Sequence, residues 1–251
     1  MPALPISHMA REVAEIPEAV ARFLDRSGPA VTAAALALRT RDPGVITTVA
    51  RGTSDHAATY LKYAVELAAG VPVASVGPSI ASIYHRPLRL TGAACIGISQ
   101  SGKSPDIVEM MRSAGQGGAL TIAITNFADS PMAQVSDHCL PLQAGEEKSV
   151  AATKTFIASV TAGLAVLAGW QQDADLAKAV AALPDALAKA VALDWSPLSA
   201  RLVRAESVYV LGRGPGYAVA CEAALKMKET CGLHAEAYSA AEVLHGPAAI
   251  V

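Results

Sequence analysis

Short runs of apolar residues alternate with longer helical patterns along most of the chain. The runs predict strands at residues 45–50, 71–76, 93–98, 120–125, 138–142 and 207–211. Between them, apolar residues recur at three- and four-residue steps, which predicts helices at residues 55–69, 105–113, 150–170 and 217–230. This alternation is typical of a parallel sheet covered by helices on both faces, so the sequence predicts an α/β fold with a doubly wound parallel sheet.

Further helical patterns lie before the first predicted strand and again before the last one. Residues 8–26 predict an amphipathic helix that Pro17 kinks or restarts. Two more helices are predicted before the last strand, at residues 173–193, where Pro184 interrupts the pattern, and at 197–204. We therefore expect an N-terminal helical segment (1–30), a first α/β domain (31–172), connecting helices (173–205) and an incomplete second α/β domain (206–251).

A weak internal repeat supports the second domain. Ala50-Arg51-Gly52 aligns with Gly212-Arg213-Gly214 at an offset of 162 residues, and Glu66 and Glu229 fall near the same place on the helices that follow. Residues 215–251 are too few for a whole doubly wound domain, and we expect the chain to end in mid-strand.

Composition and charge narrow the class of protein. Apolar residues make up 52% of the chain, which excludes global disorder, and a net charge of −2 with 4% aromatic residues disfavours nucleic-acid and anionic-membrane partners. The most apolar helical stretch, residues 156–170, is shorter than the roughly 20 residues that span a bilayer. The four cysteines form no C-x-x-C pair and are interpreted as reduced thiols of a cytoplasmic protein; they are Cys95, Cys139, Cys221 and Cys231.

Two loops that follow predicted strands are rich in hydroxyl groups. They are Gly52-Thr53-Ser54 and Ser99-Gln100-Ser101-Gly102-Lys103-Ser104. In a parallel sheet such loops meet at one edge, where helix N-termini and hydroxyl donors suit a phosphate group. The alternative is that Ser101 or Ser104 only caps a helix. No Walker P-loop or G-x-G-x-x-G motif occurs in the sequence, which disfavours P-loop kinases and nicotinamide enzymes.

A third segment gathers acids and histidines. Lys226 and Glu229 are three residues apart on one face of a predicted helix, where the alternative is a solvated ion pair. His234-Ala235-Glu236 and His245 follow, and a carboxylate with an imidazole suits proton transfer between adjacent carbons and opening of a sugar ring. Metal binding is disfavoured because the histidines lack the spacing of known zinc motifs, so we expect no metal and no cofactor.

These motifs together resemble a known family. Ser99-Gln100-Ser101-Gly102, Ala152-Thr153-Lys154 and the run from Ala224 to Pro247 are similar to the sugar isomerase (SIS) domain family. Within it, the closest branches are the isomerase half of glutamine–fructose-6-phosphate aminotransferase and the SIS-type glucosamine-6-phosphate deaminases. The resemblance covers nearly the whole chain and implies a flavodoxin-like sheet, with two repeats of which the second is truncated.

The resemblance also implies roles for single residues. The sugar phosphate would be held by hydroxyl and amide groups, with Ser54 the weakest member of the set: Thr53, Ser54, Ser99, Gln100, Ser101 and Ser104. Val150 would contact the sugar through its backbone. Glu229 would move a proton between C1 and C2, and Lys226 would assist at the sugar hydroxyls. His245 would help to open the ring and would come from the neighbouring subunit, which implies a homodimer with shared active sites.

Some features depart from the aminotransferase pattern. That branch begins with a glutamine-hydrolysing domain whose catalytic cysteine is the mature N-terminus, whereas the first cysteine here is Cys95. Its C-terminal tail, which carries a lysine that reaches the sugar carbonyl, has no counterpart in the sequence. Arg51 stands where the branch usually has cysteine and Lys103 where it has glutamate, and both changes would favour an anionic ligand.

The sequence therefore predicts a hexose 6-phosphate enzyme without glutaminase activity. The leading hypothesis is conversion of glucosamine 6-phosphate to fructose 6-phosphate and ammonia. The alternatives are a stand-alone aldose–ketose isomerase, a deglycase that acts on a glycated amine phosphate, and a non-catalytic sugar-phosphate sensor.

Overall fold

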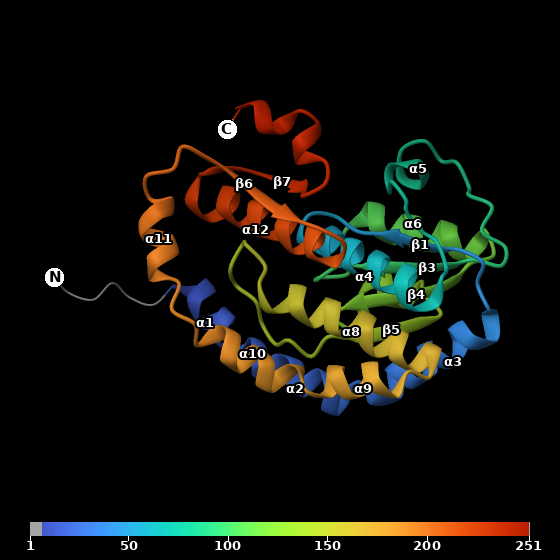
Figure 1. Cartoon of the computed structure of the whole chain (residues 1–251). Helices are drawn as coiled ribbons and strands as arrows, with labels where there is room; N and C mark the ends of the chain where they lie inside the picture. The colour runs from blue at the N-terminus through green and yellow to red at the C-terminus, as the bar shows by residue number, and fades with distance from the viewer. Residues whose placement is uncertain (1–6, 251) are drawn as a thin grey trace.

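Three helices precede the first strand in the computed structural model, which describes residues 7–250 (Figure 1). They are α1 (His8–Ala14), α2 (Ile16–Arg26) and α3 (Gly28–Arg41). The helical pattern at residues 8–26 is thus divided at Glu15. Pro17 lies in the first turn of α2, where its missing N–H costs no helical hydrogen bond, so the predicted restart is confirmed.

Helix α3 has no counterpart among the helices predicted from the sequence. Its apolar residues are spread around the helix rather than gathered on one stripe, so periodicity gives little signal. Its many alanines favour the helix through propensity alone. Burial of Ala34, Ala35 and Leu38 against the core then fixes its place.

Five parallel strands form the central sheet, in the order β2-β1-β3-β4-β5. The strands are β1 (Ile46–Val49), β2 (Val73–Ser75), β3 (Ala94–Ile98), β4 (Leu120–Thr125) and β5 (His138–Pro141). Each lies within a predicted apolar run. The order is that of flavodoxin-like sheets, which confirms the predicted fold class.

Helices cover both faces of this sheet. They are α4 (Thr53–Ala69), α5 (Ser79–Ser82), α6 (Pro105–Gln116), α7 (Pro131–Gln134) and α8 (Lys154–Gln171). α3, α4 and α8 pack on one face around Ile96 and Trp170, whereas α5 and α6 pack on the other around Cys95 and Met111. Adjacent residues of β3 thus point into different cores, as strand geometry requires.

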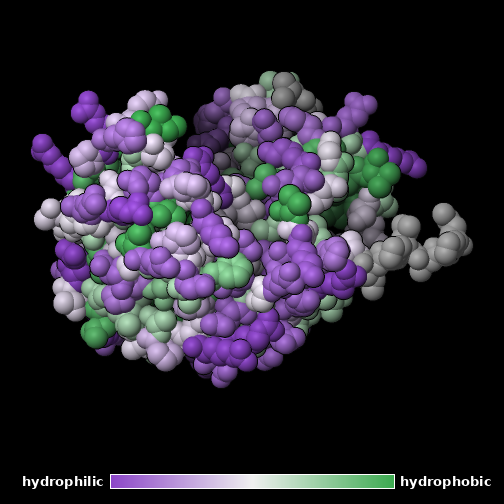
Figure 2. All heavy atoms as spheres, turned by 180° about the vertical axis from the view of Figure 1, so that it is seen from behind, coloured by the Kyte–Doolittle hydropathy of each residue, from purple (hydrophilic) through white to green (hydrophobic). Residues whose placement is uncertain are grey.

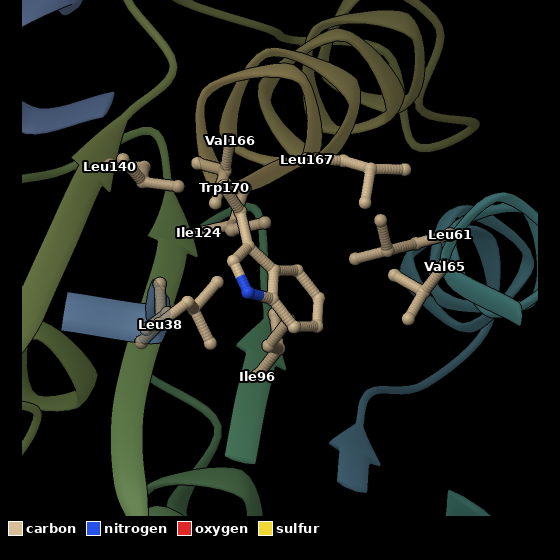
Figure 3. Close-up of a pocket in the computed structure, with 11 residues that line it drawn as sticks. Leu38, Leu61, Val65, Ile96, Ile124, Leu140, Val166, Leu167 and Trp170 are labelled. Carbon is tan, nitrogen blue, oxygen red and sulfur yellow. The ribbon is translucent and has the colours of Figure 1, made fainter. Parts of the chain in front are cut away.

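A small cavity remains between the sheet and α8, and Figure 3 shows that its walls are apolar. Its free volume is about 10 Å³, room for about one water at most. Leu61, Ile124 and Trp170 are among the side chains that enclose it, and they offer a water no hydrogen-bond acceptor. The cavity is therefore part of the core and not a ligand site.

Three further helices connect the sheet to the last part of the chain: α9 (Ala174–Ala181), α10 (Leu183–Val191) and α11 (Ser196–Leu202). The pattern breaks at Ala182, and Pro184 lies in the first turn of α10, so the predicted interruption is confirmed. Within residues 7–250, none of the helices is both long and apolar enough to cross a bilayer. The face seen in Figure 2 carries scattered apolar side chains among polar ones.

The last part of the chain repeats the unit β1–α4–β2. β6 (Ser207–Gly212), α12 (Pro215–Cys231) and β7 (His234–Ser239) form a two-stranded parallel sheet with its own helix. α4 and α12 each have 17 residues and lie 162 positions apart. Each begins after a glycine of positive φ, Gly52 (φ 55°, ψ −130°) and Gly214 (φ 57°, ψ −136°). The predicted internal repeat is therefore confirmed.

The C-terminal region differs from the prediction in two ways. β7 has no counterpart among the predicted strands, because its sequence mixes small and charged residues. The strand expected at the chain end is replaced by two 3-10 helices, η1 (Val243–His245) and η2 (Pro247–Ile250), while Val251 lies outside the described residues. Gly246, with φ 149°, turns the chain between them, and its carbonyl accepts the N–H of Ala249 at 2.9 Å.

Candidate active site

The loops that follow β1 and β3 lie side by side at the carboxyl edge of the central sheet. The two strands are hydrogen-bonded neighbours, with Val49 opposite Gly97. α4 and α6 then leave the sheet on opposite faces. Open α/β sheets bind ligands at such a point, where the strand order reverses. Both hydroxyl-rich loops identified in the sequence, 52–54 and 99–104, are placed there.

The serine turn, residues 99–104, is shaped by its own hydroxyl groups. Ser99 Oγ accepts the N–H of Gly102 at 3.2 Å, and Ser101 Oγ accepts the N–H of Lys103 at 3.3 Å. Gly102 adopts a left-handed φ of 61°, which glycine reaches without strain. These bonds hold the backbone amides of the turn in one arrangement before any ligand is present.

Gln100 and Ser104 connect the serine turn to its surroundings. The backbone carbonyl of Gln100 accepts the N–H of Asn126 at 3.0 Å and the hydroxyl of Thr125 at 3.3 Å, which fastens the turn to the end of β4. Ser104 occupies the N-cap position of α6, but its side chain makes no capping hydrogen bond. Because Ser101 and Ser104 are only half-buried, the turn is open to a ligand.

Helix α12 reaches the loop after β1 through Lys226. The ammonium lies 3.0 Å from Thr53 Oγ1, 3.2 Å from Glu222 Oε1 and 2.5 Å from Glu229 Oε2. An ammonium has three donors, and here each faces one acceptor. The Lys226 side chain is 17% exposed and the Glu229 side chain is 35% exposed, so the pair is only partly shielded from solvent.

Thr53 and Ser54 lie in the first turn of α4, the helix that packs against α12. Besides accepting from Lys226, the Thr53 hydroxyl donates to Glu222 Oε1 at 3.0 Å. Glu222 is buried and also contacts His56 Nδ1 at 2.7 Å through its other carboxylate oxygen. The structure thus joins Thr53 to Lys226 and Glu229, and it places Ser54 half-buried in the first turn of α4.

The interface of α4 and α12 is poorly solvated beside this network. Burial raises the pKa of Asp55 on α4 and also the pKa of the Cys221 thiol on α12. The pKa of Tyr217 is raised to about 12, mainly by its hydrogen bond with Cys221 and secondly by burial. All four cysteines are free, and burial raises the pKa of Cys95 to about 11.

Two cationic side chains, Arg51 and Lys103, belong to the loops that follow β1 and β3. Arg51 Nε lies 2.5 Å from Asp106 Oδ2, in the first turn of α6, so its charge is paired in this structure. Lys103 is exposed and lies over the ring of Phe127, 5.8 Å from its centroid. Of the two charges that the sequence places beside the turn, Lys103 is therefore the one without a carboxylate contact among the described residues.

Val150 lies in a loop and not in the long helix expected from residue 150. α8 begins at Lys154 because the Glu147 carboxylate accepts the N–H groups of Thr153 (2.9 Å) and Thr155 (3.2 Å), which ends the loop there. The buried Glu12 carboxylate of α1 accepts the N–H of Lys148 at 2.5 Å. Val150 is fully exposed at the tip.

The ion pair between the buried Lys154 and the half-exposed Glu15 gives a stability prediction. Lys154 is 2% exposed, and its ammonium lies 2.5 Å from Glu15, which is about half exposed. The hydrogen bond from Lys154 lowers the pKa of Glu15. Glu15→Gln leaves a buried ammonium without its counter-charge and should cost about 1–3 kcal/mol, whereas Lys154→Met leaves a carboxylate that water reaches and should cost less.

Urea unfolding of the two variants measures this difference. Since folding lowers the pKa of Glu15, the stabilisation from the pair should be present above the unfolded value of 4.5 and disappear as the pH falls through the folded one. Equal losses for both variants would contradict the asymmetry.

His245 is exposed in η1, and among the residues that the structure describes no hydrogen bond or ion pair joins it to Lys226 or Glu229. His234 lies 2.8 Å from Ser207 Oγ and 4.0 Å from Glu236, also at the surface. Across residues 7–250, no group of three or more histidine, cysteine or acidic side chains is placed to hold a metal ion.

Glu222 and His56 belong to the candidate site by their contacts, but neither is predicted from the sequence. Glu222 precedes Lys226 by four residues, a helical spacing that puts both on one face and could have identified it. His56 offers no such signal, because its contact with Glu222 spans 166 residues.

Comparisons with known proteins identify the family of the chain. The SIS domain family model matches residues 41–169. The isomerizing glutamine–fructose-6-phosphate aminotransferase of Zymomonas mobilis is 36% identical over 82% of this chain and 36% of its own length, and that of Bradyrhizobium diazoefficiens is 34% identical over 97% and 42%. The chain thus spans about two fifths of the length of these relatives.

Solved structures extend the comparison. A candidate phosphosugar isomerase from Silicibacter pomeroyi is 56% identical, with a TM-score of 0.95 over 98% of this chain and 75% of its own. The C-terminal domain of the glucosamine-fructose-6-phosphate aminotransferase from Francisella tularensis is 30% identical, with a TM-score of 0.78 over 98% and 73%. A glucosamine-6-phosphate deaminase from Thermotoga maritima, 20% identical over 98% and 74%, shares the fold with a TM-score of 0.78. The chain belongs to the SIS domain family.

Proposed function

We propose that the protein binds a hexose 6-phosphate and converts glucosamine 6-phosphate and water to fructose 6-phosphate and ammonia. The observation that carries the proposal is the contact of the Lys226–Glu229 pair with Thr53. The pair lies on α12 of the second repeat, and Thr53 lies at the start of α4, after β1, beside the point where the strand order of the central sheet reverses. An acid–base pair beside an anion-binding turn is what proton transfer on a phosphorylated sugar requires. The similarity to isomerizing aminotransferases supports the choice of an amino sugar.

The serine turn would hold the phosphate. Backbone N–H groups at the start of α6, the helix dipole and the hydroxyls of Ser99, Ser101 and Ser104 supply donors for a dianion, with Gln100 beside them. Val150, exposed at its loop tip, is available to contact the sugar through its backbone.

Glu229 would carry the proton in the ring-opened sugar. Its carboxylate takes the C2 proton while O1 gains a proton from solvent, which gives an enolamine across C1 and C2. The carboxylate returns its proton to C1, which gives an iminium at C2. Water then adds to C2, and loss of ammonia with one proton to solvent gives the ketose and ammonia. Lys226 would stabilise charge on the sugar oxygens. We further propose that His245 opens the ring from the neighbouring subunit of a homodimer.

An aldose–ketose isomerase is the second candidate. The same transfer between C1 and C2 serves a substrate with a hydroxyl at C2, and the 56% identity to the candidate phosphosugar isomerase from Silicibacter pomeroyi favours it. The test is to assay the protein for ammonia and fructose 6-phosphate from glucosamine 6-phosphate, with glucose 6-phosphate and a fructosamine phosphate in parallel. Release of ammonia supports the deaminase, isomerisation without ammonia supports the second candidate, and binding without turnover would contradict both.

Removal of the Asp106 charge, which pairs with Arg51, should raise the affinity for a phosphorylated sugar. An exposed ion pair contributes at most about 1 kcal/mol, so a dianion on the serine turn can compete for the guanidinium. Asp106→Asn releases Arg51 and removes a carboxylate from the start of α6. The dissociation constant for glucosamine 6-phosphate should fall up to about fivefold, while that for glucosamine stays constant. Calorimetric titration measures both, and an equal change for the two sugars would contradict a phosphate site at this turn.

A further inference from the structure

The contacts of Glu222 join the two halves of the candidate site. Its side chain is 9% exposed, and its Oε1 accepts the hydroxyl of Thr53 at 3.0 Å and faces the ammonium of Lys226 at 3.2 Å. Its Oε2 lies 2.7 Å from His56 Nδ1. Thr53 and His56 belong to α4 in the first repeat, whereas Lys226 belongs to α12 in the second. A carboxylate so deeply buried is costly unless both oxygens are hydrogen-bonded, and here both are.

Lys226, Thr53 and Glu222 form a closed ring of hydrogen bonds. The ammonium donates to Thr53 Oγ1, the threonine hydroxyl donates to Glu222 Oε1, and that oxygen also faces the ammonium. A threonine hydroxyl has one proton, so its direction in the ring is fixed. The remaining donor of Lys226 is directed at Glu229. Two of the three ammonium donors thus face Thr53 and Glu222, and the third faces Glu229.

We propose that Glu222 is a positioning residue, which holds Lys226 at Thr53 and limits the positive charge that Glu229 faces. The proposal rests on the proposed function, in which Glu229 moves the substrate proton. The charged groups around Glu229 are Lys226 and Glu222 on α12, with His56 on α4 behind Glu222. On β7, which also packs on α12, His234 and Glu236 face each other.

The Glu222→Gln substitution removes the negative charge of the side chain and keeps its shape, so it tests the role of the charge. Without the Glu222 charge, Lys226 stabilises the ionised form of Glu229 more strongly, so the acid limb of kcat/KM should move down by about one pH unit. kcat should fall about tenfold with KM nearly unchanged. The matched control is Glu66→Gln, since the Glu66 carboxylate accepts the N–H of Val73 at 3.1 Å and lies in the last turn of α4, away from Thr53 at its start. An acid limb that stays in place in Glu222→Gln, or that moves equally in the control, would overturn the proposal.

Glu222→Met tests the position, because it removes the charge and the acceptors at similar volume. kcat should fall about 100-fold, the order of loss expected from misplacement of a reacting group by about 1 Å. A crystal structure of this variant provides a readout that needs no turnover, and it should show the Lys226 ammonium beyond hydrogen-bond distance of Thr53 Oγ1. An ammonium that stays at Thr53 overturns the positioning role whatever the activity. If the ammonium moves but the wild-type protein turns over no sugar phosphate, the proposed function is wrong and the positioning of Lys226 by Glu222 still stands.

Discussion

Glu229→Gln should lower the turnover of glucosamine 6-phosphate by about 10³-fold and leave its binding nearly unchanged. An amide keeps the shape of the side chain but cannot take a proton from C2, and a positioned general base contributes about 10²–10⁴-fold. The phosphate contacts of the serine turn are untouched by the change. Stopped assays of ammonia release, together with calorimetric titration of the substrate, separate the two effects.

Glu109→Gln is the matched control for this variant. Glu109 is also a partly exposed helical acid that pairs with a basic residue three positions away, in this case Arg112 on α6. Its loss should leave the turnover unchanged. Activity that survives in Glu229→Gln would mean that another group moves the proton, and the assigned mechanism would be wrong.

Gly102→Val should raise the dissociation constant for glucosamine 6-phosphate by about 100-fold, which corresponds to about 2.7 kcal/mol. A Cβ at this position would lie 2.2 Å from Ser130 Oγ and 2.9 Å from Thr125 Oγ1, and the left-handed φ of 61° is unfavourable for a branched side chain. The turn must therefore open, and the amides that Ser99 and Ser101 hold in place lose their common direction.

Gly92→Ala separates this effect from backbone strain. Gly92 has a similar left-handed φ of 78°, but a Cβ there would meet nothing within 4 Å. Thermal unfolding should show a modest loss of stability for this variant, and titration should show unchanged affinity. Unaltered phosphate affinity in folded Gly102→Val would place the phosphate elsewhere.

The sheet could be predicted because its strands are short apolar runs between helical patterns. The runs that became β1, β3 and β4 are buried along their whole length, so the sequence has to be apolar there. Glycines marked the repeat, since Gly52 and Gly214 adopt nearly the same unusual conformation before α4 and α12. α3 and β7 were missed because their residues follow neither periodicity clearly.

The chemistry of the site was only partly visible in the sequence. Hydroxyl-rich loops and the Lys226–Glu229 spacing are local patterns, and the structure places them at one edge of the fold. The contact of His56 with Glu222 depends on how α4 packs against α12, which no local pattern encodes. The pairing of Arg51 with Asp106 likewise depends on the neighbouring strands β1 and β3.

A crystal structure of the protein with bound glucosamine 6-phosphate tests the central claim most directly. The account predicts phosphate oxygens at the serine turn between β3 and α6, and C1 and C2 of the sugar within hydrogen-bond reach of the Glu229 carboxylate. A phosphate bound away from residues 99–104, or a sugar whose C1 and C2 lie far from Glu229 in the assembled protein, would contradict it.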